Sequence, residues 1–366
     1  MDVQQSYAQW LKDFASDPET VAELESIRGN DAEIEDRFYT ELSFGTAGMR
    51  GVLGAGTNRM NRYNVRRATK GLAAYLHTQP GAAERGVVIA YDSRRCSDLF
   101  ARETAQVLCQ EGVKAYLFDA LRPVPILSYA VRHLGAAAGV VITASHNPPQ
   151  YNGYKVYGED GAQLGPEAAA GVTSFIRATP YTACVLMDME EAKAKGLLHI
   201  IGNKEVDDDY IAQVKTLCVN PEMLAREGGS LSIVYTPLHG SGNVPVRRIL
   251  KEVGITHVSV VKEQELPDPN FSTLKVPNPA ELPLRAKQVA GELKEKEKLI
   301  ESLIAKLAQN RLENVFQDAQ EVGGVKVVYA LLSGTSPDAL RALCDKAKER
   351  EEAIVAVFAG VSGGKA

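Results

Sequence analysis

The chain has 366 residues, of which 45% are hydrophobic and 24% are charged, and this is ordinary globular composition. It excludes a disordered, fibrous or collagen-like protein. Lysine and arginine total 41 against 46 aspartate and glutamate residues, and the formal net charge of -5 does not favour nucleic acid as a partner.

Residues 1–190 predict a helical flank followed by an α/β domain. Residues 1–40 are polar with apolar residues at helical spacing, so we expect an N-terminal helical flank. Over 41–190, apolar strand-like runs alternate with helical segments, which is typical of βαβ units in a mainly parallel sheet. The clearest strand-like runs are 87–91, 115–118 and 138–143.

Residues 191–279 repeat this alternation on a smaller scale, with a helix between strands at 231–235 and 258–261. We expect an incomplete second domain whose apolar sheet edge would be exposed. The hypothesis that follows is that a later strand, 325–332, pairs with one of these two strands. Prolines between 267 and 279 disfavour helix and predict extended chain.

The sequence changes character after Pro279. Residues 284–316 form one charged helical pattern in which Leu293, Ile300 and Leu307 recur every seventh residue, a coiled-coil signature. Self-association through 284–314 is therefore one candidate property, although polar seam residues argue against a long dimer formed by this stretch alone. Beyond it, 317–366 predict a small α+β tail.

No segment of the sequence resembles a membrane anchor or a disulfide framework. The longest apolar run, 134–144, is too short for a bilayer span of roughly 20 residues, and no signal-peptide pattern opens the chain. We therefore expect a cytoplasmic protein with no membrane partner. The five cysteines are scattered without a CxxC pair, which supports neither disulfides nor a zinc site.

The sharpest candidate site follows the buried run 138–143. Ligands of open α/β sheets bind where such strands end, and a serine exposed there beside a histidine could act as a nucleophile or carry a phosphoryl group. The alternative is a plain strand-to-turn segment in which Ser145 and Asn147 bond their own backbone. From spacing alone the two interpretations have similar weight. The segment is Thr143, Ala144, Ser145, His146, Asn147, Pro148, Pro149.

Two further runs could contribute cations to the same place. Lys155 follows closely and could neutralise a phosphate or move a proton, although a solvated strand lysine is the commoner case. The glycine-rich run 44–51 contains Thr46 and Arg50, and glycines there would let backbone amides approach an anion that Arg50 could grip. Glycine-rich turns are common, so this motif is weak by itself.

Together these runs resemble the α-D-phosphohexomutases, specifically the phosphoglucomutase and phospho-sugar mutase branch. The resemblance covers about residues 1–279 and includes, in order, the runs 91–94, 236–240 and 268–279. It implies αβα-layer domains, one complete and one incomplete here. It also implies an isomerase that moves phosphate between positions of a sugar phosphate substrate through a bisphosphorylated sugar, which also serves as activator.

The same resemblance implies roles for individual residues. Ser145 would be the phosphoserine with His146 beside it, Lys155 a general acid or base, and Arg50 a ligand of the phosphoryl group. Residues implied to bind substrate are Thr46, Asn147 and His239.

The resemblance also implies Mg2+, held by the phosphate on Ser145 together with a loop of three alternating aspartates. That loop should lie shortly after Pro279 and is not found there in the sequence. A single aspartate, Asp338, cannot replace three carboxylates around a hard cation. We therefore expect the mutase-type activity to be impaired, and whether the chain is an active enzyme stays open.

The tail, 284–366, has a resemblance of its own, to a truncated C-terminal region of alanyl-tRNA synthetase. It is carried by the charged helix and the runs 322–327 and 339–341. It implies oligomerisation or tRNA contact, of which RNA contact is disfavoured by the charge balance. The alternative function is accordingly a non-catalytic fusion or fragment whose tail associates with another chain.

Overall fold

The computed structural model describes residues 2–274, 276–279, 291–300, 302–303, 316, 319–333 and 337–361. The chain divides into two compact units, Met1–Pro279 and Ala280–Ala366, and each is described here by itself. The division falls at the residue where the sequence changes character. The predicted coiled-coil-like helix, 284–316, lies largely outside the described residues. Within it, residues 291–300 are described and are helical.

A six-stranded sheet organises the first domain, with strand order β1-β5-β4-β2-β3-β6. Strands β4, β2, β3 and β6 run parallel to one another, while β5 pairs antiparallel with β4 and β1 pairs antiparallel with β5. The predicted mainly parallel α/β fold is therefore confirmed. The strands are β1 Met49–Val52, β2 Val87–Tyr91, β3 Ala115–Phe118, β4 Ala138–Ile142, β5 Tyr151–Gly158 and β6 Leu198–Ile201.

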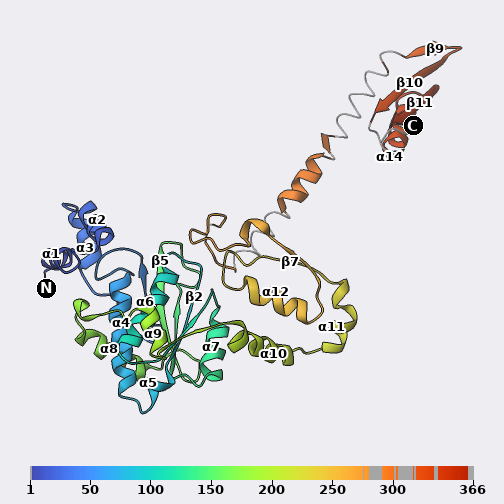
Figure 1. The fold of residues 1–366 in the computed structure, drawn as a ribbon. Coiled ribbons are helices and arrows are strands. Elements are labelled where there is room, and N and C mark those ends of the chain that lie inside the picture. The colour runs from blue at the N-terminus through green and yellow to red at the C-terminus, as the bar shows by residue number, and fades with distance from the viewer. Residues whose placement is uncertain are drawn as a thin grey trace. The chain divides into compact units, whose positions relative to one another are not determined.

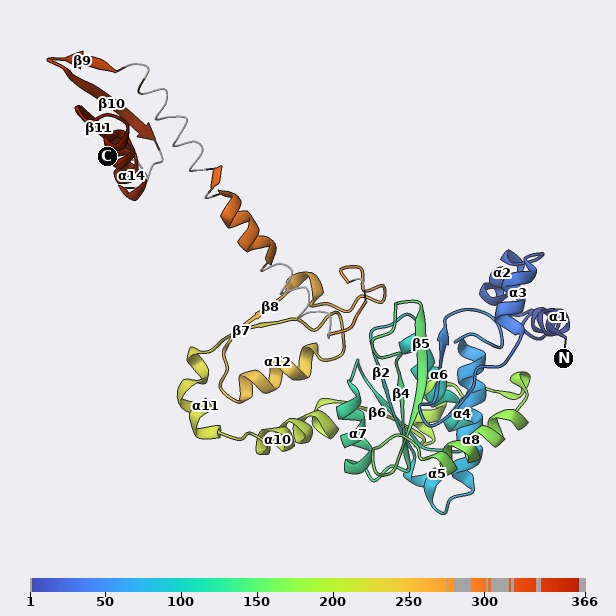
Figure 2. The same cartoon turned by 180° about the vertical axis from the view of Figure 1, so that it is seen from behind.

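Helices cover both faces of this sheet, as Figure 1 and, from behind, Figure 2 show. Alternate residues of a strand point to opposite faces, so Ile89 and Val140 belong to one apolar cluster while Val88 and Val141 belong to another. The first cluster is covered by α4, α6 and α8, and the second by α7. The helices are α4 Arg62–His77, α5 Ala82–Arg85, α6 Ser97–Gln110, α7 Val124–His133, α8 Pro166–Ala178 and α9 Met189–Ala194.

The N-terminal flank consists of three helices. They are α1 Val3–Asp13, α2 Pro18–Ser26 and α3 Asp31–Phe38. Their aromatic side chains pack against Tyr63 of α4: the rings of Trp10 and Tyr63 lie 5.7 Å apart edge to face, and Phe14 stacks on Tyr63 at 3.5 Å. The flank therefore shares an apolar core with the first helix of the α/β domain.

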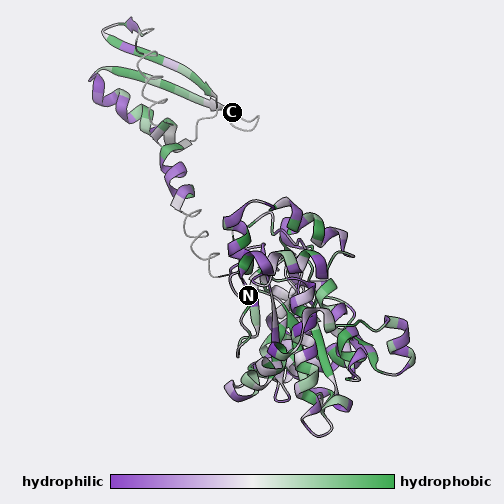
Figure 3. Ribbon diagram, turned by 90° about the vertical axis from the view of Figure 1, so that its left-hand side faces the viewer, coloured by the Kyte–Doolittle hydropathy of each residue, from purple (hydrophilic) through white to green (hydrophobic). Residues whose placement is uncertain are grey.

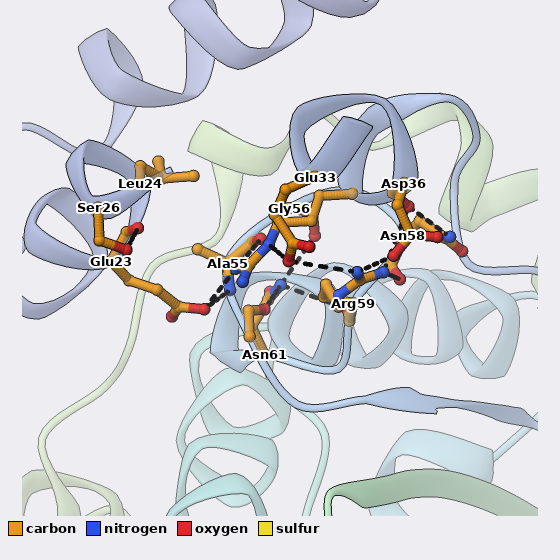
Figure 4. Close-up of polar contacts among 12 residues, drawn as sticks. Glu23, Leu24, Ser26, Glu33, Asp36, Ala55, Gly56, Asn58, Arg59 and Asn61 are labelled. Atoms are coloured by element: carbon orange, nitrogen blue, oxygen red, sulfur yellow. Dashed lines mark hydrogen bonds and ion pairs between the residues drawn. The ribbon is translucent and has the colours of Figure 1, made fainter. Parts of the chain in front are cut away.

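Polar contacts join the same flank to the loop that leads into α4 (Figure 4). Glu23 of α2 accepts a hydrogen bond from the backbone N–H of Ala55 at 3.1 Å, and Asp36 of α3 pairs with Arg59. Asn61 donates to the carbonyl oxygens of Gly54 and Gly56 and caps α4 by accepting from the N–H of Asn64. The start of α4 is thus fixed by residues of the flank and of this loop.

The second domain contains a two-stranded parallel sheet, β7 Ser232–Tyr235 and β8 His257–Val260, which matches the two predicted strands closely. The hypothesis that residues 325–332 pair with one of them is wrong. Among the described residues, that segment pairs with two other strands of the tail. The helices of this domain are α10 Asp208–Thr216, α11 Pro221–Glu227 and α12 Asn243–Glu252.

The tail is a small α+β unit, as predicted. Strand β10 Val325–Ser333 pairs parallel with β11 Ile354–Val361 and antiparallel with β9 Gln320–Val322, and α14 Pro337–Arg350 connects the two parallel strands. The two longer strands are mainly green in Figure 3, whereas α14 mixes hydrophilic and hydrophobic residues. Across the described parts of both units, no helix is long and apolar enough to cross a membrane.

Candidate active site

Ser145 lies on the loop that joins β4 to β5, at the carboxyl edge of the parallel strands. Its backbone N–H donates to Thr143 Oγ1 at 2.9 Å, and its side chain is exposed. The backbone of Ser145 adopts a φ of +57°, in the left-handed region that costs a non-glycine residue free energy. Such strain is typical of a position that the surrounding structure has to hold in place.

His146 contacts Ser145, and Arg50 contacts Asn147 of the same loop. The Oγ of Ser145 and the Nδ1 of His146 lie 3.2 Å apart, within hydrogen-bond distance. Arg50, on β1, donates from its guanidinium to the side-chain oxygen of Asn147 at 3.2 Å. The structure therefore brings together residues that lie about one hundred positions apart in the chain, because β1 pairs with β5 next to β4.

Lys155 lies on β5, where its register partner on β4 is Val141. The side chain is half-buried, and burial lowers the pKa of its ammonium group, with the positive charges of Arg50 and Arg94 lowering it further. The carboxylate of Asp92 acts in the opposite direction. A lysine that loses its proton more readily than usual is suited to proton transfer.

The glycine-rich run forms a tight turn against β5. Gly45 and Gly48 exchange backbone hydrogen bonds at 3.0 and 2.8 Å. Gly48 has a φ of +75°, and a Cβ on it would lie 2.0 Å from the carbonyl oxygen of Tyr154. Only glycine permits this approach, which sets the turn beside the residue preceding Lys155. Thr46 is exposed in the turn.

A cleft of about 440 Å3 opens beside the serine, a size in the usual range for small-molecule sites. The first domain contributes residues that follow β2 and β4, and the second domain contributes the turn after β7 and the loop near 271. The residues that line the cleft include Asp92, Ser93, Ser145, His146, Leu238 and Phe271.

His239 is not among the residues that line this cleft. It is 4% exposed, and both of its ring nitrogens engage the protein: Nδ1 lies 2.8 Å from the carbonyl oxygen of Leu266 and Nε2 lies 2.7 Å from Thr273 Oγ1. The structure therefore places His239 beneath the loop 266–273 and does not bring it to Ser145. Its implied role in substrate binding stays a prediction.

Two residues beside the serine were not among the predicted site residues. Asp92 is half-buried and accepts from the N–H of Arg94 at 3.0 Å, from Ser97 Oγ at 2.7 Å and from Thr143 Oγ1. Burial raises the pKa of Asp92 and lowers that of Arg94. The signal that could have found them is their position directly after the buried strand β2, at the same sheet edge as Ser145.

The described residues do not fit the expected magnesium site. Within the described ranges, no group of three or more His, Cys, Asp or Glu side chains is placed to hold a metal ion. Asp92, the carboxylate on the cleft, already uses both oxygens for protein partners, and Arg50, Arg94 and Lys155 nearby are cations. No step of the chemistry is therefore derived through Mg2+.

This αβα fold, with a serine loop at its strand ends, is that of the phosphohexomutases. Residues 41–182 match the phosphoglucomutase/phosphomannomutase α/β/α domain I, and residues 208–308 match domain II of the same family. Because the two matches follow in order and cover about two thirds of the chain, the chain belongs to the phosphoglucomutase/phosphomannomutase family. The second match extends beyond Pro279, where the sequence analysis placed the end of the resemblance.

Individual relatives agree with this family. The chain is 40% identical over 248 residues to a phosphoglucomutase of Staphylococcus haemolyticus, covering 68% of this chain and 44% of the relative. It is 34% identical over 286 residues to a phosphopentomutase of Mus musculus, covering 76% of this chain and 46% of the relative. The chain thus spans less than half the length of these curated relatives.

A solved structure of a Thermus thermophilus protein, described as a phosphomannomutase, superposes with a TM-score of 0.54 at 27% identity. The superposition covers 64% of this chain and 48% of that one.

The resemblance of the tail to alanyl-tRNA synthetase stays a prediction.

Proposed function

We propose that this chain is a phosphohexomutase-type phosphoryl carrier, which takes a phosphoryl group from a bisphosphorylated sugar onto Ser145 and returns it to a sugar phosphate. The observation that carries the proposal is the exposed Ser145 on the lining of a cleft. Two cations on the neighbouring strands support it: Arg50, which contacts Asn147 of the serine loop, and the half-buried Lys155 of β5. Family membership supports the same chemistry.

In the proposed transfer, the bond from phosphorus to the sugar oxygen breaks and a bond from phosphorus to Ser145 Oγ forms. The serine proton ends on the sugar oxygen, and Lys155 is the group proposed to take it up and return it. A loose phosphoryl transition state spreads negative charge over its oxygens, so cations fixed nearby stabilise it. Arg50, which donates a hydrogen bond to Asn147, is the group proposed to supply such a charge.

We expect complete turnover of a sugar phosphate to be slower than the transfer of a phosphoryl group to Ser145. Complete turnover requires a sugar that presents each of its two phosphate positions to the serine in sequence, and binding the remote phosphate contributes to the rate. Among the described residues, no group of three or more His, Cys, Asp or Glu side chains is placed to hold a metal ion, and the cleft lining includes no lysine or arginine that could bind the remote phosphate. Phosphorylation of Ser145 is therefore the step that tests the proposal most directly.

The test incubates the dephosphorylated full chain with glucose 1,6-bisphosphate and follows phosphoryl uptake by intact mass and peptide mapping. We expect one phosphoryl group on Ser145 and none in Ser145→Ala. Ser241→Ala is the matched control, because it removes another serine hydroxyl from the same cleft and should leave uptake unchanged. Uptake that is absent, or that maps to a different residue, would contradict the proposal. A coupled assay of glucose 1-phosphate conversion then measures turnover.

A second candidate function, self-association through the tail, is favoured by one observation. Four large apolar side chains of the β10–β11 sheet are between 49% and 70% exposed: Tyr329, Leu331, Val355 and Val357. An exposed apolar patch of this kind is typical of an interaction surface. The full chain should then be a dimer in light scattering, and Tyr329→Ser with Leu331→Ser should give a monomer; a monomeric parent chain would rule this function out.

A further inference from the structure

Arg94 makes an unusual set of contacts with the loop that carries Ser145. Its side chain is almost wholly enclosed, with the residue 3% exposed. One terminal nitrogen donates to the carbonyl oxygens of Pro148 at 2.9 Å and Tyr151 at 3.0 Å, and the other donates to those of Ser145 at 2.9 Å and Asn147 at 2.6 Å. A single guanidinium group thus holds four carbonyl oxygens of one loop.

The loop needs such a donor for a physical reason. It follows no helix or strand pattern between β4 and β5, so few of its carbonyl oxygens have partners within regular structure. Pro148 and Pro149 supply no backbone N–H, and Ser145 occupies a left-handed conformation that does not persist without support. The contacts of Arg94 fix the carbonyl group of the strained residue and the backbone that follows it.

Arg94 is itself held from two directions. Asp92 accepts from the backbone N–H of Arg94, and its carboxylate lies 3.4 Å from the Nε of Arg94. Asp92 also accepts from Thr143 Oγ1, which in turn accepts from the N–H of Ser145. On its open side, the guanidinium lies over the ring of Phe271 at 5.2 Å. Two separate hydrogen-bonded routes therefore lead from the Asp92–Arg94 turn to the backbone of Ser145.

We propose that Arg94 is a positioning residue for phosphoryl transfer: it holds the backbone of Ser145 so that the serine oxygen is aimed into the cleft. The proposal rests on the proposed function for its activity test, but its geometry stands on the contacts described. Lysine is not an adequate substitute, because a point charge with three donors cannot reproduce the planar fork that reaches four carbonyl oxygens.

A purely structural role predicts something different, and Arg67 provides the comparison. Arg67 is also buried, and its Nε donates to the carbonyl oxygens of Ile176 at 3.1 Å and Thr179 at 2.8 Å, at the end of α8. It does not line the cleft beside Ser145. Replacing either arginine removes carbonyl contacts from a buried site, but only Arg94 contacts the serine loop.

The experiment compares Arg94→Lys with Arg67→Lys in the full chain, using glucose 1,6-bisphosphate as the phosphoryl donor. We expect Arg94→Lys to lower the maximum rate of Ser145 phosphorylation about 10- to 100-fold, because small misplacements of a reacting group cost rates of that order. The donor concentration for half-maximal rate should change little. Arg67→Lys should lower the melting temperature similarly and leave the maximum rate within about twofold of the parent.

Hydrogen–deuterium exchange over residues 143–151 separates failure of this inference from failure of the proposed function. If the parent chain takes up no phosphoryl group, the proposed function fails. Faster exchange in this segment of Arg94→Lys, but not of Arg67→Lys, would still show that Arg94 holds the serine loop. Equal exchange and equal phosphorylation rates in the two lysine variants would overturn it. Should Arg94→Lys not fold, Thr143→Val cuts the second route and should slow phosphorylation in the same direction by a smaller factor; an unchanged rate in a folded Thr143→Val would overturn the positioning role.

Discussion

The first and second domains bury the strands of their sheets to very different extents. In the first, β4 is buried at all five positions because helices cover both faces of a six-stranded sheet. In the second, β7 and β8 alternate between exposed and half-buried residues, and Val234 is 78% exposed. A two-stranded sheet is marginal without a packed face, so buried apolar side chains should contribute far more to the free energy of unfolding in the first domain than in the second.

The largest difference should appear when apolar side chains are shortened. Ile89→Ala in β2 removes a fully buried side chain and should cost about 2–5 kcal/mol in the free energy of unfolding. Val234→Ala in β7 should cost less than about 0.5 kcal/mol, because the side chain is mostly in water. Urea unfolding followed by circular dichroism measures both, and similar costs at the two positions would end the contrast between the domains.

The next largest difference concerns ion pairs. Glu103 of α6 accepts two hydrogen bonds from Arg66 at 2.8 and 2.7 Å, and its side chain is almost buried. Glu103→Gln should therefore cost about 1–3 kcal/mol, the usual range for a lost bond to a buried charged group. Asp208 pairs with Arg248 in the second domain at an exposed position, and Asp208→Asn should cost below about 1 kcal/mol. When the same unfolding measurement is repeated at high salt, the cost of Asp208→Asn should fall and that of Glu103→Gln should not.

A glycine substitution should distinguish the domains by local geometry. Gly48→Ala places a Cβ against the carbonyl oxygen of Tyr154 at a positive φ, and we expect a cost of about 1–3 kcal/mol together with slower phosphorylation of Ser145. Gly229→Ala in the second domain meets no atom within 4 Å and should be nearly neutral. Thermal unfolding with the phosphorylation assay tests the pair, and a neutral Gly48→Ala would show that the turn is not fixed by β5.

The smallest expected effect is a pH dependence. The pKa of Lys155 is lower in the folded protein than in the unfolded chain, mainly through burial, so the folded state binds fewer protons between the two values. The unfavourable contribution of the charged lysine to stability is therefore complete below the folded pKa and fades as the pH rises toward 10.5, the ordinary pKa of a lysine. Lys155→Met should raise the melting temperature slightly at neutral pH, with a smaller gain near pH 10, and should slow phosphorylation. A gain that grows with pH would contradict this assignment.

The sequence predicted the parallel part of the first domain well. The strand-like runs 87–91 and 115–118 coincide with β2 and β3, because continuous apolar segments are typical of strands buried on both faces. It did not predict β1 or β6 as strands, although both join the sheet. Both are edge strands of four residues, and β1 contains a glycine, so neither shows the long apolar run that reveals a central strand.

The candidate site was predicted in part, for a related reason. Arg50, Ser145 and Lys155 were proposed from a serine motif, a nearby lysine and a glycine-rich turn, and the structure places them around one sheet edge. Arg94 was missed because its importance lies in the directions of four carbonyl oxygens on a loop some fifty residues later. No periodicity in a sequence reports the direction of a loop carbonyl.

The contacts between the helical flank and the loop before α4 have a practical consequence for dissecting this protein. The match to domain I of the family begins at residue 41 and ends at 182, yet Glu23 and Asp36 hold the loop that starts α4, and β6 closes the sheet at 198–201. A fragment cut at the family boundaries would lose a capping scaffold at one end and a sheet strand at the other. The smallest autonomous piece is therefore expected to run from the first helix through β6, some sixty residues longer than the segment by which its ancestry is recognised.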